Sequence, residues 1–126
     1  MVHKPIEPAH SELLSLCGVN VRPMFGGLGY FDAGKMFGLV HTDKLYLRAG
    51  ETNVADYLIV GQMPFVHEVH GEHHALSFYS VPRPIIEEPE LLRGWAEKAL
   101  NETRRVTSRQ RISRYNLARR GRALKH

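Results

Sequence analysis

A dense group of histidines and glutamates is the part of this sequence best equipped for chemistry. The group comprises His67, Glu68, His70, Glu72, His73 and His74. Gly71-Glu72 suits a two-residue type II′ turn, because glycine takes the positive φ of the first turn position. In that hairpin His70 pairs with His73. Glu68 lies on the same face, so Glu68, His70 and His73 converge as the ligands of an open zinc site do.

The same segment has a plainer interpretation. His and Glu form the solvated face of an edge hairpin, while Val69, Leu76 and Phe78 face inward. A hairpin tip also lacks the fixed surroundings that hold metal ligands in place. The solvated face is the favoured interpretation. A metal- or small-molecule-binding protein built on residues 67–74 is the alternative function.

Other residue types that carry chemistry form no complete catalytic pattern. The Gly-Gly-Leu-Gly run at 26–29 lacks the Lys-Ser/Thr of a P-loop, so it predicts a bend or bulge in a sheet. Cys17 lies at the end of an apolar helix, whose C-terminal partial charge disfavours a thiolate, and is interpreted as a small buried hydrophobe. Ser77 and Ser80 lie in a strand-like run without a nucleophile elbow, with Ser77 facing solvent. We therefore expect a protein that is not an enzyme and has no cofactor.

The charge of the chain is divided sharply along its length. Residues 1–103 hold eight Lys and Arg against thirteen Asp and Glu, a net charge of −5, whereas residues 104–126 hold nine basic residues and no acid, +9. Such asymmetry indicates an anionic partner. The basic residues are Arg104, Arg105, Arg109, Arg111, Arg114, Arg119, Arg120, Arg122 and Lys125.

This basic tail favours nonspecific contact with DNA or RNA. Arginine forks bind phosphate in a bidentate manner, and Tyr115 has the ring to stack on an unpaired base. Two alternatives stay open: the tail is a solvated arm, or it pairs with the acidic body of a neighbouring copy.

Hydrophobic periodicity predicts the elements that position these residues. Helices are expected at residues 6–17 and 51–60, ending at Gly18 and Gly61. A third helix opens at Glu88-Pro89-Glu90. Its apolar stripe is Leu91, Leu92, Trp95, Ala99 and Leu100.

The predicted strands form an antiparallel sheet. Three apolar runs between residues 20 and 49 are joined by turns at 32–35 and 42–44. Two more strands are expected at 65–70 and 73–79, and Pro82 and Pro84 end the sheet. The predicted order is α-βββ-α-ββ-α, an α+β fold without a βαβ repeat.

Composition bounds the class of protein. The 126 residues, 43% of them hydrophobic and 24% charged, suit one globular domain. No apolar run reaches membrane-span length, the start has no signal-peptide pattern, and a lone Cys17 predicts no internal disulfide. We expect a cytoplasmic protein with a domain at 1–103 and a basic C-terminal tail at 104–126.

Several of these runs together resemble the N-terminal domain of the TfoX/Sxy competence regulators. Residues 24–29, Met-Phe-Gly-Gly-Leu-Gly, resemble its MFGG-x-G motif. The runs at 36–40, 45–48, 64–65 and 77–82 resemble its later signatures, and 88–92 with Trp95-Ala96 resembles its closing helix. The resemblance covers residues 11–103 in the order and spacing of the family.

The resemblance implies a fold and a role. It implies an α+β domain with an antiparallel sheet, similar in outline to secretion chaperones. It also implies a transcriptional co-regulator or adaptor, because family members act on competence genes with a cyclic-AMP receptor protein. Full-length regulators have a second helical domain, whereas here 23 residues, nine of them Lys or Arg, follow the closing helix. The expected partner is a protein of the transcription machinery, with a homodimer through an exposed sheet edge as a further structural alternative.

Overall fold

Two tight turns set the register in the first half of the sheet. In this computed structural model, which describes residues 5–24, 26–69 and 72–105 (backbone alone at 67–69 and 72–76), both turns have two residues with positive φ. Ala33-Gly34 has φ of 51° and 79°, and Thr42-Asp43 has 51° and 61°. Two successive positive φ values are the mark of type I′ turns, whose twist matches that of the flanking strands. Both predicted turns are confirmed.

These turns join the strands of an antiparallel meander. The strands are β1 (Val19–Met24), β2 (Gly27–Asp32), β3 (Lys35–His41) and β4 (Lys44–Arg48). The sequence predicted three strands here, and β1 is the one it omitted. The exposed residues Arg22 and Pro23 interrupt the apolar pattern of β1. Proline is tolerated there because β1 lies at an edge of the sheet, where a missing donor breaks no inner ladder.

The remaining elements follow the predicted order. They are α1 (Ala9–Leu14), α2 (Val54–Ile59), β5 (Pro64–Val69), β6 (Glu72–Ser80), α3 (Arg83–Ile86) and a long helix described over residues 89–105. α1 and α2 are shorter than the predicted 6–17 and 51–60. The short α3, which has Pro84 in its first turn, was not predicted. Gly18 and Gly61 have φ of 81° and 73°, as helix-ending glycines do.

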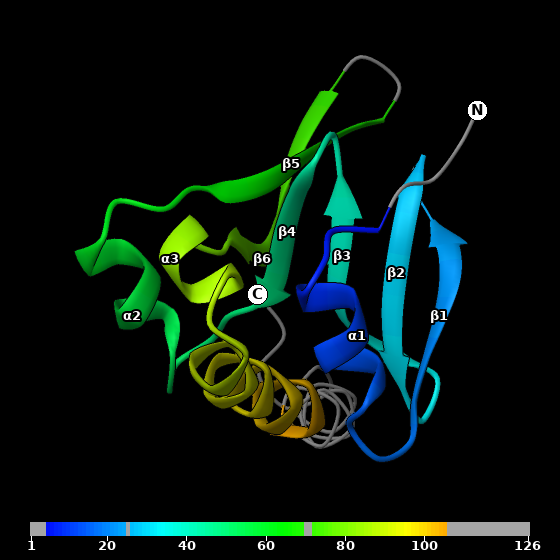
Figure 1. Cartoon of the computed structure of the whole chain (residues 1–126). Coiled ribbons are helices and arrows are strands. Elements are labelled where there is room, and N and C mark those ends of the chain that lie inside the picture. The colour runs from blue at the N-terminus through cyan, green and yellow to red at the C-terminus, as the bar shows by residue number, and fades with distance from the viewer. Residues whose placement is uncertain (1–4, 25, 70–71, 106–126) are drawn as a thin grey trace, which may run out of the picture.

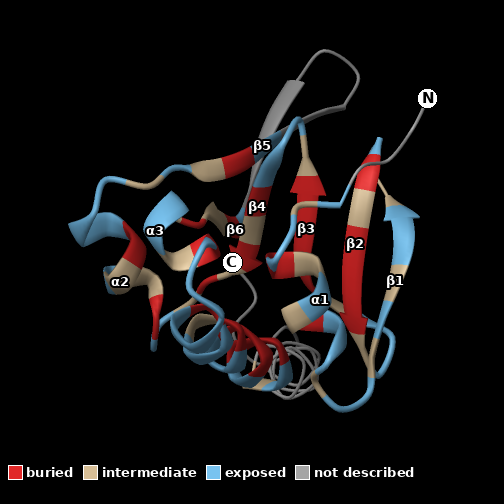
Figure 2. Cartoon of the chain, in the orientation of Figure 1, coloured by how far each residue is buried: buried red, intermediate tan, exposed pale blue. Residues whose placement is uncertain are grey.

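The six strands run in the order β1-β2-β3-β4-β6-β5, all neighbours antiparallel. The helices lie together on one face of this sheet (Figure 1). The main core lies between the two layers, where Figure 2 shows the buried residues of the long helix turned toward the strands. Tyr57 of α2 packs edge-on against Trp95 of the long helix, with ring centroids 4.7 Å apart. No described helix has the length and apolar character needed to span a membrane.

The long helix confirms most of its predicted apolar stripe. Leu92, Ala99 and Leu100 are buried in the core, together with Ala96, which the prediction omitted. Leu91 is 52% exposed, so its inclusion was wrong. One residue corresponds to about 100° around a helix, which turns Leu91 away from the face of Leu92.

The opposite face of the sheet has a smaller apolar cluster. Leu39, Phe65 and Phe78 form it, with Met36 and Tyr46 packed against them. Two guanidinium groups lie over rings on this face: Arg48 is 4.7 Å from the centre of Phe78, and Arg22 is 4.1 Å from that of Phe31. Each such contact contributes about 0.5–1 kcal/mol at an exposed site.

Cys17 differs from its predicted environment. It is exposed, whereas the sequence predicted a small buried hydrophobe. The reason is the length of α1, which ends at Leu14 and leaves Cys17 in the connection to β1.

The glycine run at 26–29 lies where strands meet closely. Gly26 has φ of 76° in the connection between β1 and β2. A Cβ on Gly27 would lie 1.8 Å from the carbonyl oxygen of Val40 in β3. The run therefore serves the sheet, as the bend interpretation predicted.

We expect Gly27→Ala to destabilise the domain by about 3 kcal/mol, because backbone atoms must move to admit the methyl group. Urea unfolding followed by circular dichroism measures this loss. Gly94→Ala is the matched control, since a Cβ there meets nothing within 4 Å and Gly94 lies inside the long helix. The control should gain up to about 1 kcal/mol. Equal stability of the two variants would contradict the close approach at Gly27.

Candidate functional site

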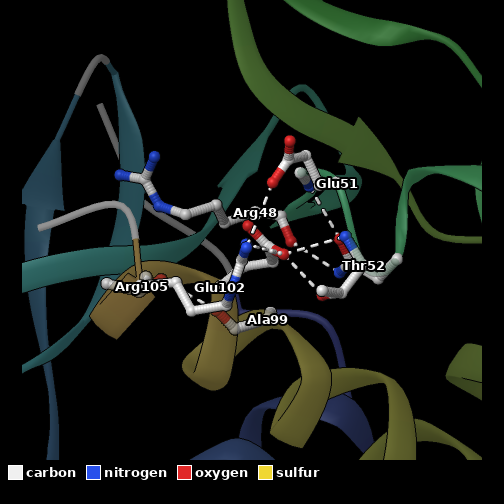
Figure 3. A network of polar contacts seen from close by, with 9 residues as sticks. Arg48, Glu51, Thr52, Ala99, Glu102 and Arg105 are labelled. Atoms are coloured by element: carbon white, nitrogen blue, oxygen red, sulfur yellow. Dashed lines mark hydrogen bonds and ion pairs between the residues drawn. The ribbon is translucent and has the colours of Figure 1, made fainter. Parts of the chain in front are cut away.

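A buried carboxylate joins the long helix to the loop after β4. Glu102 is 1% exposed. It accepts hydrogen bonds from the backbone N–H of Thr52 (3.0 Å), from the Thr52 hydroxyl and from Nη1 of Arg105 (2.9 Å). Figure 3 shows these groups converging between the helix and the loop. We call Arg48, Glu51, Thr52, Asn53, Glu102 and Arg105 the helix clamp.

The loop side of the helix clamp depends on Gly50 and Asn53. A Cβ on Gly50 would lie 2.1 Å from Oε1 of Glu102, so only glycine leaves room for the carboxylate. Asn53 is 1% exposed. Its Oδ1 accepts from the Gly50 N–H at 2.7 Å, and its Nδ2 donates to the Arg48 carbonyl at 3.0 Å. These bonds hold the loop in the shape that presents Thr52 to the helix.

The electrostatics of the helix clamp keep Glu102 ionised. Burial alone raises its pKa, but the two hydrogen bonds from Thr52 and the charge of Arg105 outweigh burial, and the pKa is lowered overall. Arg105 also donates to Glu51 at 3.1 Å, so one guanidinium joins two carboxylates. The result is a charged network that orders the end of the described helix.

Arg48 extends the helix clamp to the other face of the sheet. Its Nη2 donates to the Met36 carbonyl at 3.2 Å, while its buried Nε has no partner among the described residues. Burial lowers the pKa of Arg48, and the nearby charge of Glu102 partly offsets this. Arginine stays protonated in proteins, so a cation lies over the ring of Phe78.

Sequence reasoning missed Glu102, although a signal was present. Residues 95, 99 and 102 follow the i, i+4, i+7 spacing of the core-facing side of the long helix. A lone acid on that side indicates a buried partner.

Two of the predicted nucleic-acid-binding residues are held by the body of the domain. Arg104 pairs with Asp32 at 3.3 Å, and Arg105 pairs with Glu51 and Glu102. Both belong to the long helix. The other seven lie outside the described residues: Arg109, Arg111, Arg114, Arg119, Arg120, Arg122 and Lys125.

The strand register corrects one detail of the predicted metal site. Glu68 pairs with His73, and Val69 pairs with Glu72, so the expected pairing of His70 with His73 is wrong. His70 itself lies outside the described residues. Among the side chains that the structure describes, no three of His, Cys, Asp or Glu gather around a common point for a metal ion. The site of Glu68, His70 and His73 stays a prediction, and calorimetry with Zn²⁺ tests it.

The two serines have structural surroundings. Ser77 is exposed, as predicted. The hydroxyl of Ser80 donates to Oε1 of Gln62 at 2.7 Å, which ties β6 to the loop before β5.

The motifs of the sheet and the closing helix match a known family. The model of the TfoX N-terminal domain matches residues 12–103, most of the chain and nearly the span over which the sequence resembled it. The chain belongs to the TfoX N-terminal domain family. The α+β fold with an antiparallel sheet agrees with that family, as expected. Glu102 lies inside the matched residues, at their end.

One relative is similar to this chain over most of its length. The DNA transformation protein TfoX1 of Aliivibrio fischeri is 29% identical to this chain over 107 residues. The alignment covers 80% of this chain and 51% of the relative. The chain thus spans about half the length of that protein.

We expect Glu102→Gln to destabilise the domain by about 1.5–3 kcal/mol at neutral pH, because it removes a charged acceptor from buried donors. The lowered pKa of Glu102 gives stability that is complete above its ordinary value of 4.5 and is lost as the pH falls through the folded-state pKa. The gap between variant and wild type should therefore close at acid pH. Urea titrations over a range of pH values measure this.

Glu97→Gln is the matched control, since Glu97 is an exposed carboxylate of the same helix. It should change stability by less than about 0.5 kcal/mol. A gap for Glu102→Gln that persists unchanged at acid pH would show that its charge is not what holds the loop.

Proposed function

We propose that this TfoX N-terminal domain is a non-catalytic regulatory adaptor of the cytoplasm, which docks on a protein partner and contacts nucleic acid through its basic tail. Membership of the family supports the regulatory role, and the relative in Aliivibrio fischeri is described as a DNA transformation protein. The observation that carries the nucleic-acid part is the separation of charge between body and tail.

The described contacts sharpen this charge argument. Arg104 and Arg105 are already paired with carboxylates of the body. Residues 106–126 hold seven further basic residues and no acid, so within that segment no carboxylate opposes them. Phosphate groups supply the missing anions, and six of the seven basic residues are arginines, which bind phosphate with two parallel hydrogen bonds.

The helix clamp gives the tail a fixed starting point. Arg105 is bonded to Glu51 and Glu102 on the body. Nucleic acid held by the tail therefore stays close to the partner that the body binds. This arrangement suits an adaptor, which binds two partners at once and catalyses no reaction.

Fluorescence anisotropy of labelled duplex DNA tests the nucleic-acid part. We expect the full chain to bind with an affinity that falls steeply with salt, because each neutralised phosphate adds about 0.9 to the slope. Replacing all seven basic residues of 106–126 by glutamine should abolish binding. The described fold ends at Arg105, so this variant leaves the helix clamp intact.

Two double variants that each remove two positive charges, one from the tail and one from the body, separate the two contributions. Arg119→Gln with Arg120→Gln should reduce the salt slope by about two, whereas Lys35→Gln with Lys44→Gln, two exposed lysines of the body, should leave it unchanged. Binding that survives neutralisation of the tail would contradict its role. If no variant binds at low salt, nucleic acid is removed from the proposal.

A further inference from the structure

The exposed apolar side chains of this domain are concentrated in one region. Seven large hydrophobic residues are exposed among those the structure describes, and five of them lie between residues 58 and 66. We call these five the edge patch. They are Leu58 (56% exposed), Ile59 (81%), Val60 (50%), Met63 (68%) and Val66 (50%). Scattered exposed hydrophobics are ordinary, but a group of this kind marks an interaction site.

The edge patch lies at a border of the sheet. It spans the last turn of α2, the following loop and β5. β5 pairs with β6, and no other described strand lies along its outer side. An open edge beside apolar side chains is a surface that proteins normally cover. The border formed by β1 differs, because Pro23 interrupts its donors.

The area of the edge patch suits contact with a second copy. Five side chains that each present about 100 Å² expose on the order of 500 Å², near the upper end for the largest patch on a monomer. A two-fold contact covers the patch on both copies and buries about 1,000 Å² of apolar surface, the size that a biological interface should clear. A single patch on each copy is therefore enough to form the interface. A two-fold contact also gives a closed dimer and not a filament.

No charged residue lies within residues 57–66, which contain the edge patch. A two-fold axis brings identical groups together, so unpaired charges near it would repel. Asp56, the charged residue of α2, is already paired with Lys98 of the long helix at 2.9 Å. The five residues of the edge patch are apolar, and Gln62, which lies between them in the sequence, accepts a hydrogen bond from the Ser80 hydroxyl.

We propose that the edge patch is the dimer interface of this domain, where a second copy packs its own α2 end and β5 edge against the first. The contact is driven by apolar burial. It should therefore survive high salt, unlike a dimer made by pairing the basic tail with an acidic body, which salt would dissociate.

Sedimentation equilibrium of the full chain over a wide concentration range, at low and high salt, tests the proposal. The wild type is expected to have twice the monomer mass at both salt concentrations. Ile59→Glu and Met63→Glu should each lose the dimer. Both side chains are largely exposed, so thermal melts should show a folded domain in each variant.

Leu14→Glu is the control. Leu14 is also an exposed apolar residue, 37% exposed, but it belongs to α1, which packs beside β1 at the other border of the sheet. This variant should remain dimeric. A wild type that is monomeric throughout would overturn the proposal and leave the patch to a different protein. A dimer that dissolves in salt, or that Leu14→Glu disrupts equally, would also overturn it.

Discussion

The buried carboxylate of Glu102 is the constraint on which the arrangement of helix and sheet depends. A charge removed from water must find partners, and Glu102 finds them in Thr52 and Arg105. Because these groups come from the loop after β4 and from the long helix, the helix can adopt only the position that satisfies the carboxylate. Gly50 admits it, and the apolar residues of the helix then meet the sheet in one alignment. Apolar burial supplies most of the driving force, and the carboxylate specifies the position.

Local signals made much of the fold predictable. The turns at 33–34 and 42–43 and the helix opening at Pro89 are set by residues next to one another, so the sequence indicates them directly. β1 escaped prediction because Pro23 and its exposed neighbours hide the strand pattern, and only pairing with β2 makes it a strand. The hairpin register differed by one step, since a predicted two-residue turn leaves open which two residues form it.

The candidate site was less predictable, because its partners are distant in the sequence. The distribution of charged residues along the sequence identified a basic segment from Arg104 onward. It did not reveal that the first two arginines form ion pairs with Asp32 and Glu51. Cys17 was misplaced because α1 ends a turn earlier than periodicity indicates. For the two arginines a contact between remote residues decided the outcome, and single-sequence patterns do not record such contacts. The family match adds the regulatory context, which no single side chain carries.

The sheet face opposite the helices has its own outer layer. Arg22 and Arg48 lie over the rings of Phe31 and Phe78, with Arg48 also bonded to the Met36 carbonyl. A planar cation can rest on a ring while its edge stays hydrated, so the domain meets water on this side without a further helix. Lysine, with its compact and strongly hydrated ammonium, covers a ring poorly, so an exchange of either arginine for lysine gives up part of the roughly 0.5–1 kcal/mol of its ring contact although the charge is kept.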